Sequence, residues 1–183
     1  MIVYRVLPWD ATAHPRDRGG PLWFPRELQG DGRHDNPDRY GCLYLAEDPL
    51  AAIAEQLAPF RGTGDLRPSM LRRAGAPLAL ATIELADQVR LVDLDEPLVL
   101  KANGLRPSLV ATGQRTITQA HALRLFDAHR SAGGVRWWST LESSWINATV
   151  FDRAAEHLSV TDVVELAADQ RTVVSAARFV GLA

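Results

Sequence analysis

The sequence predicts an α+β fold built on a mixed, largely antiparallel sheet with flanking helices. Short apolar segments with strand character outnumber the segments with helical periodicity, and the two kinds do not alternate one for one. Regular alternation of strands and helices is typical of a doubly wound parallel sheet, so its absence favours α+β. With 183 residues, 46% of them hydrophobic and 23% charged, we expect one globular domain over residues 1–183.

The N-terminal segment has the polarity pattern of a strand. Residues 1–7 are expected to form a strand with Ile2, Tyr4 and Val6 on one face and Val3 and Arg5 on the other, and Pro8 ends the pattern because proline has no N–H for the ladder. Arg5 within this apolar strand leaves two alternatives open: an edge strand with the arginine in solvent, or a contact with an anion. Residues 9–32 are predicted to be a long polar connection rich in Pro and Gly.

A strand followed closely by a helix is the next predicted unit. Residues 41–46 are apolar enough for a buried strand. Asp48 suits an N-cap and Pro49 the first helical position, and together they are a strong signal for a helix start. We expect the helix to run to about Ala58 and residues 61–77 to be loop-like.

In the remaining chain, predicted strands and helices follow one another less regularly. Residues 96–116 have weak periodicity and yield no clear element. In the segment GVRWWS, Val135, Trp137 and Ser139 share one face of a strand, because successive side chains of a strand point to opposite faces. The predicted strands are residues 78–85, 89–94, 134–139, 145–151 and 158–166, and the predicted helices are residues 118–130 and 170–180.

Composition and motifs argue against several classes of function. A net charge of −2 provides no general electrostatic attraction for nucleic acid or anionic lipid. No segment approaches the roughly 20 apolar residues of a membrane span, and no secretory leader pattern is present, so we expect a cytoplasmic protein. The single Cys42 excludes an internal disulfide and is expected to be a buried thiol. None of the five histidines belongs to a metal-ligand motif, so no metal site is predicted.

Residues 30–60 contain the sharpest candidates for a polar site. Arg33 comes from a loop, Tyr44 from a predicted strand and Glu55 from a predicted helix. An ordinary structural explanation is open for each: a solvated surface arginine, a core tyrosine and a glutamate on the solvent side of its helix. Ser139, which follows two tryptophans, is equally compatible with a plain serine at a strand end.

Read in order, four segments resemble the RES-domain family, which is named for Arg, Glu and Ser and includes toxins of RES–Xre toxin–antitoxin pairs. Arg33, Glu55 and Ser139 fall on the residues that name the family, and Tyr44 falls on the tyrosine between its Arg and Glu. The segments are YRV at residues 4–6, GRHDNP at 32–37, LYLAEDPLAAIAE at 43–55, and GVRWWS with N-x-x-x-F within 134–151.

The resemblance implies a fold related to ADP-ribosyltransferases and NAD⁺ as the substrate, with no bound cofactor. The implied reaction is phosphorolysis of NAD⁺ to nicotinamide and ADP-ribose-1″-phosphate, with inorganic phosphate as co-substrate, or hydrolysis. Glu55 would then bind the ribose hydroxyl and stabilise the oxocarbenium charge, and Arg33 would bind the pyrophosphate or phosphate. Tyr44 would stack on nicotinamide, and Ser139 would contact the ribose or hold Glu55. The residues expected to assist are Arg5 and Asn147.

The chain departs from the family pattern at two places. The family often has an aromatic–Asn pair directly after the arginine, whereas here His34 and Asp35 precede Asn36, and Trp137 replaces the usual tyrosine before the serine. Two rival functions therefore stay open: transfer of ADP-ribose to a protein target, and a non-catalytic module that binds a nucleotide or a partner. The resemblance also implies an Xre-type antitoxin that covers the cleft, and it leaves the oligomeric state open.

Overall fold

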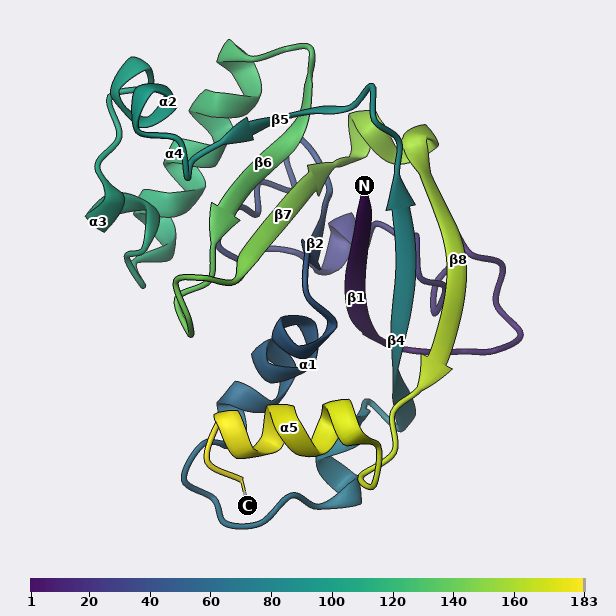
Figure 1. Ribbon diagram of the computed structural model, residues 1–183. Helices are drawn as coiled ribbons and strands as arrows, with labels where there is room; N and C mark the ends of the chain where they lie inside the picture. The colour runs from purple at the N-terminus through teal and green to yellow at the C-terminus, as the bar shows by residue number, and fades with distance from the viewer. Residues whose placement is uncertain (183) are drawn as a thin grey trace. The chain divides into compact units, whose positions relative to one another are not determined.

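Eight strands and five α-helices form the regular structure of residues 1–182, the part of the chain that this computed structural model describes (Figure 1). The strands are β1 (Ile2–Pro8), β2 (Cys42–Ala46), β3 (Arg72–Arg73), β4 (Ala76–Leu85), β5 (Arg90–Asp93), β6 (Ala132–Trp138), β7 (Ile146–Phe151) and β8 (Leu158–Glu165). The α-helices are α1 (Pro49–Leu57), α2 (Pro97–Ala102), α3 (Pro107–Val110), α4 (Arg115–Ala128) and α5 (Arg171–Phe179). The 3₁₀ helices are η1 (Arg26–Leu28), η2 (Ala58–Phe60), η3 (Pro68–Leu71) and η4 (Asp152–His157).

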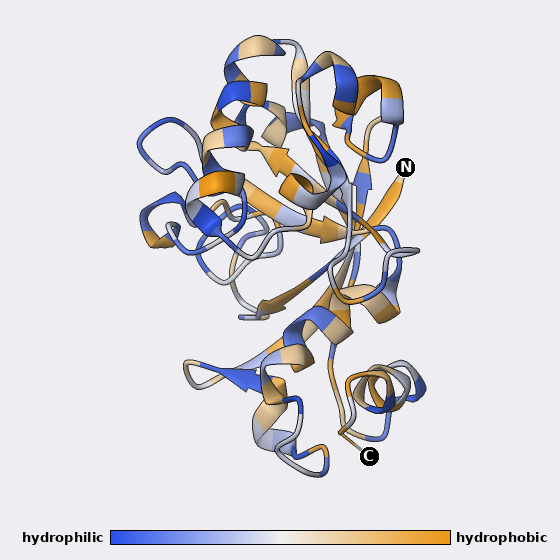
Figure 2. Ribbon diagram, turned by 90° about the vertical axis from the view of Figure 1, so that its left-hand side faces the viewer, coloured by the Kyte–Doolittle hydropathy of each residue, from blue (hydrophilic) through white to orange (hydrophobic). Residues whose placement is uncertain are grey.

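Strand pairing confirms the predicted mixed, largely antiparallel sheet structure with helices beside it. The pairs β1–β2, β1–β4, β3–β4 and β6–β7 are antiparallel, whereas β5–β6 is parallel. Figure 2 shows both blue and orange residues along the helices, so hydrophilic and hydrophobic residues are mixed in them. Among the helices of residues 1–182, none combines the length and the apolar character that a membrane span requires.

The chain divides into two compact units. Unit 1 comprises residues 1–23, residues 46–84 and the described residues from Ser159 onward, and unit 2 comprises residues 24–45 and 85–158. The expectation of one domain over residues 1–183 stays a prediction, and its last residue, Ala183, lies outside the described residues.

Unit 1 is built on β4, which pairs with β1, β3 and β8. Helix α1 packs against α5 and β1, and its buried residues include Ala51, Ile53 and Leu57. The Asp48 side chain accepts the backbone N–H groups of Leu50 and Ala51, at 2.6 and 3.4 Å. The predicted start of this helix, with Asp48 as N-cap and proline at the first helical position, is therefore confirmed.

Strand β1 is not an edge strand, so the first explanation offered for Arg5 is wrong. Seven residues of β1 pair with β4, and Tyr4 pairs with Ala46 on the other side. Arg5 is half-buried, and its Nη1 donates to the carbonyl oxygens of Pro21 (2.7 Å) and Trp23 (3.2 Å). The guanidinium therefore ties the N-terminal connection to the strand, and its contact with an anion stays a prediction.

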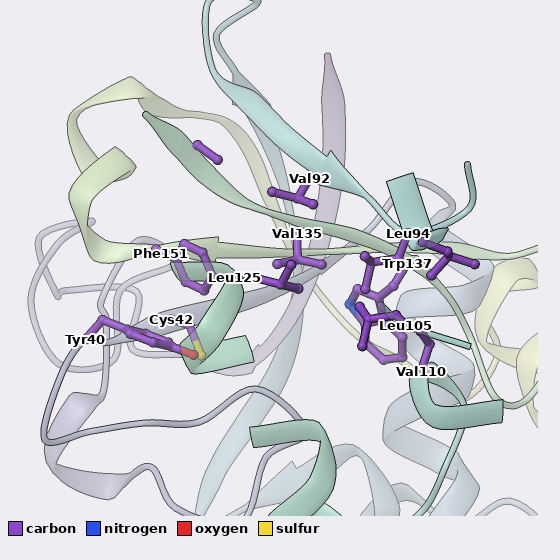
Figure 3. Close-up of a cluster of buried hydrophobic side chains, with 12 residues drawn as sticks. Tyr40, Cys42, Val92, Leu94, Leu105, Val110, Leu125, Val135, Trp137 and Phe151 are labelled. Atoms are coloured by element: carbon purple, nitrogen blue, oxygen red, sulfur yellow. The ribbon is translucent and has the colours of Figure 1, made fainter. Parts of the chain in front are cut away.

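Unit 2 contains the sheet order β2–β7–β6–β5, and α4 packs against β6. Its core gathers aromatic and aliphatic side chains from the strands, from the loop before β2 and from α2 to α4. In Figure 3, Trp137 lies beside Leu94, Leu105 and Val110 within this cluster. Gly134 permits close pairing of β6 with β7, because a Cβ there would lie 2.2 Å from the carbonyl oxygen of Thr149.

The predicted elements are confirmed with small shifts at their ends. The helix predicted for residues 118–130 begins earlier, at Arg115, and the loop-like residues 61–77 include η3 and the two-residue strand β3. Residues 96–116, which gave no clear pattern, contain α2 and α3, each with a proline as its first residue. These helices are too short, at six and four residues, to show a helical repeat.

Removal of the α1 N-cap should destabilise the protein measurably. We expect Asp48→Ala to lower the free energy of unfolding by about 1 kcal/mol, because two N–H groups of the first turn lose their acceptor. Urea denaturation of the wild type and the variant measures the difference. Asp65→Ala, at an exposed position, is the control, and equal losses in the two variants would contradict the capping role.

Candidate active site

One face of strands β6 and β7 in unit 2 carries two of the residues singled out from the sequence. Val135, Trp137 and Ser139 alternate along the chain onto this face, as predicted, and all three are buried. Asn147 lies directly opposite Trp137 in the antiparallel pair, and Thr149 lies opposite Val135. Because opposite residues of an antiparallel pair share a face, Ser139 and Asn147 belong to the same surface.

Polar side chains are buried at this place in unusual density. Buried polar groups in proteins are generally hydrogen-bonded, and none of the buried side-chain N and O atoms of the described residues lacks a partner. The buried polar or charged residues of the loop before β2 and of the β6–β7 face are Arg33, His34, Asp35, Ser139, Asn147 and Thr149. We call this set the buried polar cluster.

Trp137 is the centre of the buried polar cluster. Its indole N–H donates to Thr149 Oγ1 at 3.1 Å, and the Arg33 guanidinium carbon lies 4.9 Å from the centroid of its ring. The Trp137 and His34 rings meet edge to face, with ring centroids 5.2 Å apart and planes at 74°. An arginine over a tryptophan face at this distance is a cation–π contact, so the residue that replaces the family's tyrosine holds the arginine.

Arg33 is buried, so the explanation of a solvated surface arginine is wrong. Only 6% of the side chain is exposed. Its Nη1 donates to the carbonyl oxygens of Val110 (2.8 Å), the last residue of α3, and Thr112 (2.7 Å), just after it. A buried guanidinium needs such acceptors because an unpaired charge is costly to remove from water.

His34 is a buried neutral imidazole. It is 4% exposed, and its Nδ1 lies 2.8 Å from Thr149 Oγ1. Burial, assisted by the positive charge of Arg33, lowers the pKa of His34 to about 3. The imidazole is therefore uncharged at neutral pH and acts as a hydrogen-bonding group of fixed position.

Tyr44 uses its hydroxyl to hold the loop that carries the arginine. The hydroxyl donates to Asp35 Oδ1 at 2.7 Å and accepts the backbone N–H of His34 at 2.8 Å. Burial raises the pKa of the Tyr44 phenol, so it keeps its proton. The side chain is only partly buried, and its stacking on a substrate ring stays a prediction.

Ser139 closes the turn between β6 and β7. It is 1% exposed, its Oγ accepts the backbone N–H of Leu141 at 3.0 Å, and its own N–H donates to the carbonyl oxygen of Trp145 at 2.7 Å. These are contacts that a serine at a strand end makes in a turn, so the ordinary structural explanation stays open for Ser139. A direct contact of Ser139 or Asn147 with a substrate stays a prediction.

Glu55 and Arg5 belong to unit 1, whereas the other predicted site residues belong to unit 2. Glu55 is half-buried on α1, and Ala51, four residues before it, is fully buried. Its side chain therefore does not lie on a fully exposed helix face. Its role as a carboxylate that binds ribose stays a prediction.

Sequence reasoning missed the two residues that complete the buried polar cluster, Asp35 and Thr149, and assigned no role to His34. The only signal was the departure from the family pattern directly after the arginine, which drew attention to His34 and Asp35. His34 and Asp35 are loop residues, which have no periodicity from which burial can be deduced. Thr149 lies on β7, where strand alternation indicates its face but not its hydrogen-bond partners.

Two hollows adjoin this part of unit 2. A small cavity of about 10 Å³, roughly the space of one water molecule, is lined by His34 together with Thr118, His121 and apolar side chains. A larger cleft of about 670 Å³ is lined by residues that include Lys101 and Trp138, and by none of the predicted site residues. Within residues 1–182 no group of three or more His, Cys, Asp and Glu side chains is placed to hold a metal ion, and the absence of a metal site stays a prediction.

The low pKa of His34 should make stability depend on pH. Between pH 6.5 and about 3 the unfolded chain binds a proton at this imidazole and the folded protein does not, so acidification through this window destabilises the fold. We expect the unfolding free energy of the wild type to fall more steeply from pH 7 to pH 4 than that of His34→Asn, which keeps a polar group near Thr149 and cannot titrate. His14→Asn, at an exposed position, is the control. Equal slopes for the wild type and His34→Asn would contradict the buried neutral state.

Comparisons with known proteins agree with the fold. A family model described as the RES domain matches residues 2–172. A search of curated proteins found no match. A chain of the crystal structure of the M. tuberculosis MbcT–MbcA toxin–antitoxin complex is structurally similar, with a TM-score of 0.63, 20% sequence identity, and coverage of 99% of this chain and 87% of that chain. Because the family match spans nearly the whole chain, the protein belongs to the RES-domain family.

Proposed function

We propose that this RES-domain protein degrades NAD⁺ by phosphorolysis to nicotinamide and ADP-ribose-1″-phosphate, and that it acts as the toxin of a toxin–antitoxin pair. The observation that carries the proposal is the buried polar cluster around Trp137, which contains the family residues Arg33 and Ser139. Burial of several polar groups at one place is typical of functional sites, since a fold without such a need would place apolar side chains there.

The proposed reaction breaks the bond between nicotinamide and the ribose. The bonding electrons leave with nicotinamide, whose ring nitrogen becomes neutral, and the ribose C1″ acquires positive charge. An oxygen of inorganic phosphate then forms the new bond to C1″. Because the transition state is cationic at the sugar and anionic at the phosphate groups, it requires one negative and one positive protein group.

Arg33 is the proposed positive group. A guanidinium has a planar set of N–H donors that matches phosphate oxygens, and it stays charged even when buried. The contact with Trp137 and the carbonyl oxygens of Val110 and Thr112 restrict its position before substrate binds. A restricted arginine loses little conformational entropy when it binds an anion, which favours this role.

Glu55 is the proposed negative group. Its carboxylate would bind the ribose hydroxyl and stabilise the positive charge at C1″, as an electrostatic contribution that grows in the transition state. Ser139, Asn147, Tyr44 and Arg5 are the further residues proposed to contact the substrate. NAD⁺ is thus a substrate, and no resident cofactor or metal ion is required.

The proposed partner is an antitoxin, of Xre type, that covers the substrate site. Support comes from the structural similarity to a chain of the MbcT–MbcA toxin–antitoxin complex, together with membership of the RES-domain family. An antitoxin that covers the site would keep NAD⁺ away from Arg33 and Glu55 in the complex.

The first test measures the release of nicotinamide from NAD⁺. Incubation of the purified protein with NAD⁺ should release nicotinamide in the presence of inorganic phosphate and much less without it, as measured by chromatography. Equal release without phosphate would indicate hydrolysis, and transfer of label from NAD⁺ to protein would indicate ADP-ribosylation. Absence of turnover from folded protein under all conditions would contradict the proposal.

A second test concerns the carboxylate of Glu55. We expect Glu55→Gln to lower kcat by about 100-fold or more, because it removes the negative charge that stabilises the transition state. The unfolding temperature should stay close to that of the wild type, since the substitution keeps the shape of the side chain. Gln56→Ala, the next residue on α1, is the matched control and should retain activity. Wild-type kcat in Glu55→Gln would remove Glu55 from the mechanism.

A further inference from the structure

One buried carboxyl group collects the hydrogen bonds of the loop between η1 and β2. Asp35 is 6% exposed, and its Oδ2 accepts the backbone N–H groups of Gly30 (2.9 Å) and Gly32 (2.7 Å). Its Oδ1 accepts the hydroxyl of Tyr44 (2.7 Å) and the thiol of Cys42 (3.4 Å). A carboxylate has about four acceptor positions, so these contacts use its capacity.

The same contacts fix both chain neighbours of Arg33. The N–H of Gly32 donates directly to Asp35, and the N–H of His34 donates to the Tyr44 hydroxyl, which is itself bonded to Asp35. A Cβ at Gly32 would lie 2.5 Å from Asp35 Oδ1 and from the Tyr44 oxygen, so the loop closes on the carboxyl group only with glycine there. The backbone before and after the arginine therefore has little freedom.

The residue after the arginine has two further anchors. The carbonyl oxygen of His34 accepts the hydroxyl of Tyr40 at 2.7 Å. The Nδ1 atom of the His34 ring lies 2.8 Å from Thr149 Oγ1. Tyr40 is fully buried against Phe126 and Phe151. With the backbone held in this way, the Arg33 side chain leaves the loop in one direction, toward the Trp137 ring.

We propose that Asp35, together with the Tyr44 hydroxyl, is a positioning residue for Arg33. The functional part of this inference rests on the proposed function, because it takes Arg33 as the group that binds phosphate. The inference also accounts for the departure from the family pattern, since the inserted pair His34 and Asp35 supplies the anchors. It adds to Tyr44 a task that is independent of any stacking on substrate.

The physical reason is the cost of misplacing a buried charge. Without the Asp35 carboxylate, the N–H groups of Gly30 and Gly32 lose a charged acceptor and the loop can adopt other conformations. The guanidinium would then spend part of its time away from the position over Trp137. Activity that depends on Arg33 should fall in proportion to the fraction of molecules in which the guanidinium is out of place.

The kinetic test is a double-mutant cycle with Tyr44→Phe, which removes one hydroxyl and keeps the ring, and Arg33→Lys. We expect Tyr44→Phe to lower kcat/KM for NAD⁺ by about 10- to 100-fold, as for loss of a hydrogen bond to a charged group. Since Tyr44 acts through Arg33, the double variant should be no less active than Arg33→Lys alone. If the double variant instead loses kcat/KM by the product of the two single losses, the positioning role is overturned.

Asp35→Asn tests the carboxylate itself, and Asp31→Asn, an exposed residue of the same loop, is the matched control. In NMR exchange experiments we expect the amide protons of Gly32 and His34 to exchange about 10- to 100-fold faster in Asp35→Asn, while the amide of Val135 in β6 is unchanged. Asp31→Asn should behave as the wild type. Unchanged exchange at Gly32 and His34 in Asp35→Asn would overturn the inference.

The two measurements separate failure of this inference from failure of the proposed function. If the wild type shows no turnover of NAD⁺, the proposed function fails, and amide exchange alone decides whether Asp35 fixes the loop. If the wild type is active and Tyr44→Phe and Asp35→Asn retain full kcat/KM, the positioning role fails while the proposed function stands.

Discussion

The four hydrogen bonds accepted by Asp35 determine where the arginine of this RES-domain protein lies. Gly30 and Gly32 donate from the loop, and Tyr44 and Cys42 donate from β2. Burial raises the pKa of the Cys42 thiol, which therefore keeps the proton that it donates. One carboxyl group thus joins a glycine-containing loop to a strand of the sheet, and the loop takes its conformation from the strand.

The sheet supplies the second constraint. Trp137 and Thr149 lie on neighbouring strands of unit 2, and a hydrogen bond between them fixes the plane of the indole ring. The ring then offers one face to Arg33 and makes an edge-to-face contact with the His34 ring. A neutral imidazole between a threonine hydroxyl and the indole ring adds no charge beside the guanidinium. The low pKa of His34 is therefore a consequence of the same packing that holds the arginine.

Much of the fold could be predicted because its local signals are strong. The pair Asp48–Pro49 marks the start of α1, and the alternation of GVRWWS places Trp137 and Ser139 on one face. The burial of Arg33 could not be predicted, because it depends on carbonyl groups at Val110 and Thr112, about 80 residues away in the chain. The partners of Arg5 were missed for the same reason, since the carbonyl groups of an irregular loop leave no pattern in the sequence.

The most direct test of the proposed chemistry is a ³¹P NMR spectrum of NAD⁺ and inorganic phosphate after incubation with the protein. Phosphorolysis predicts loss of the inorganic phosphate signal and a new phosphate monoester signal coupled to the ribose H1″, in equal amount to the nicotinamide released. An unchanged spectrum without release of nicotinamide would contradict NAD⁺ degradation. Loss of NAD⁺ with the inorganic phosphate signal intact would contradict phosphorolysis.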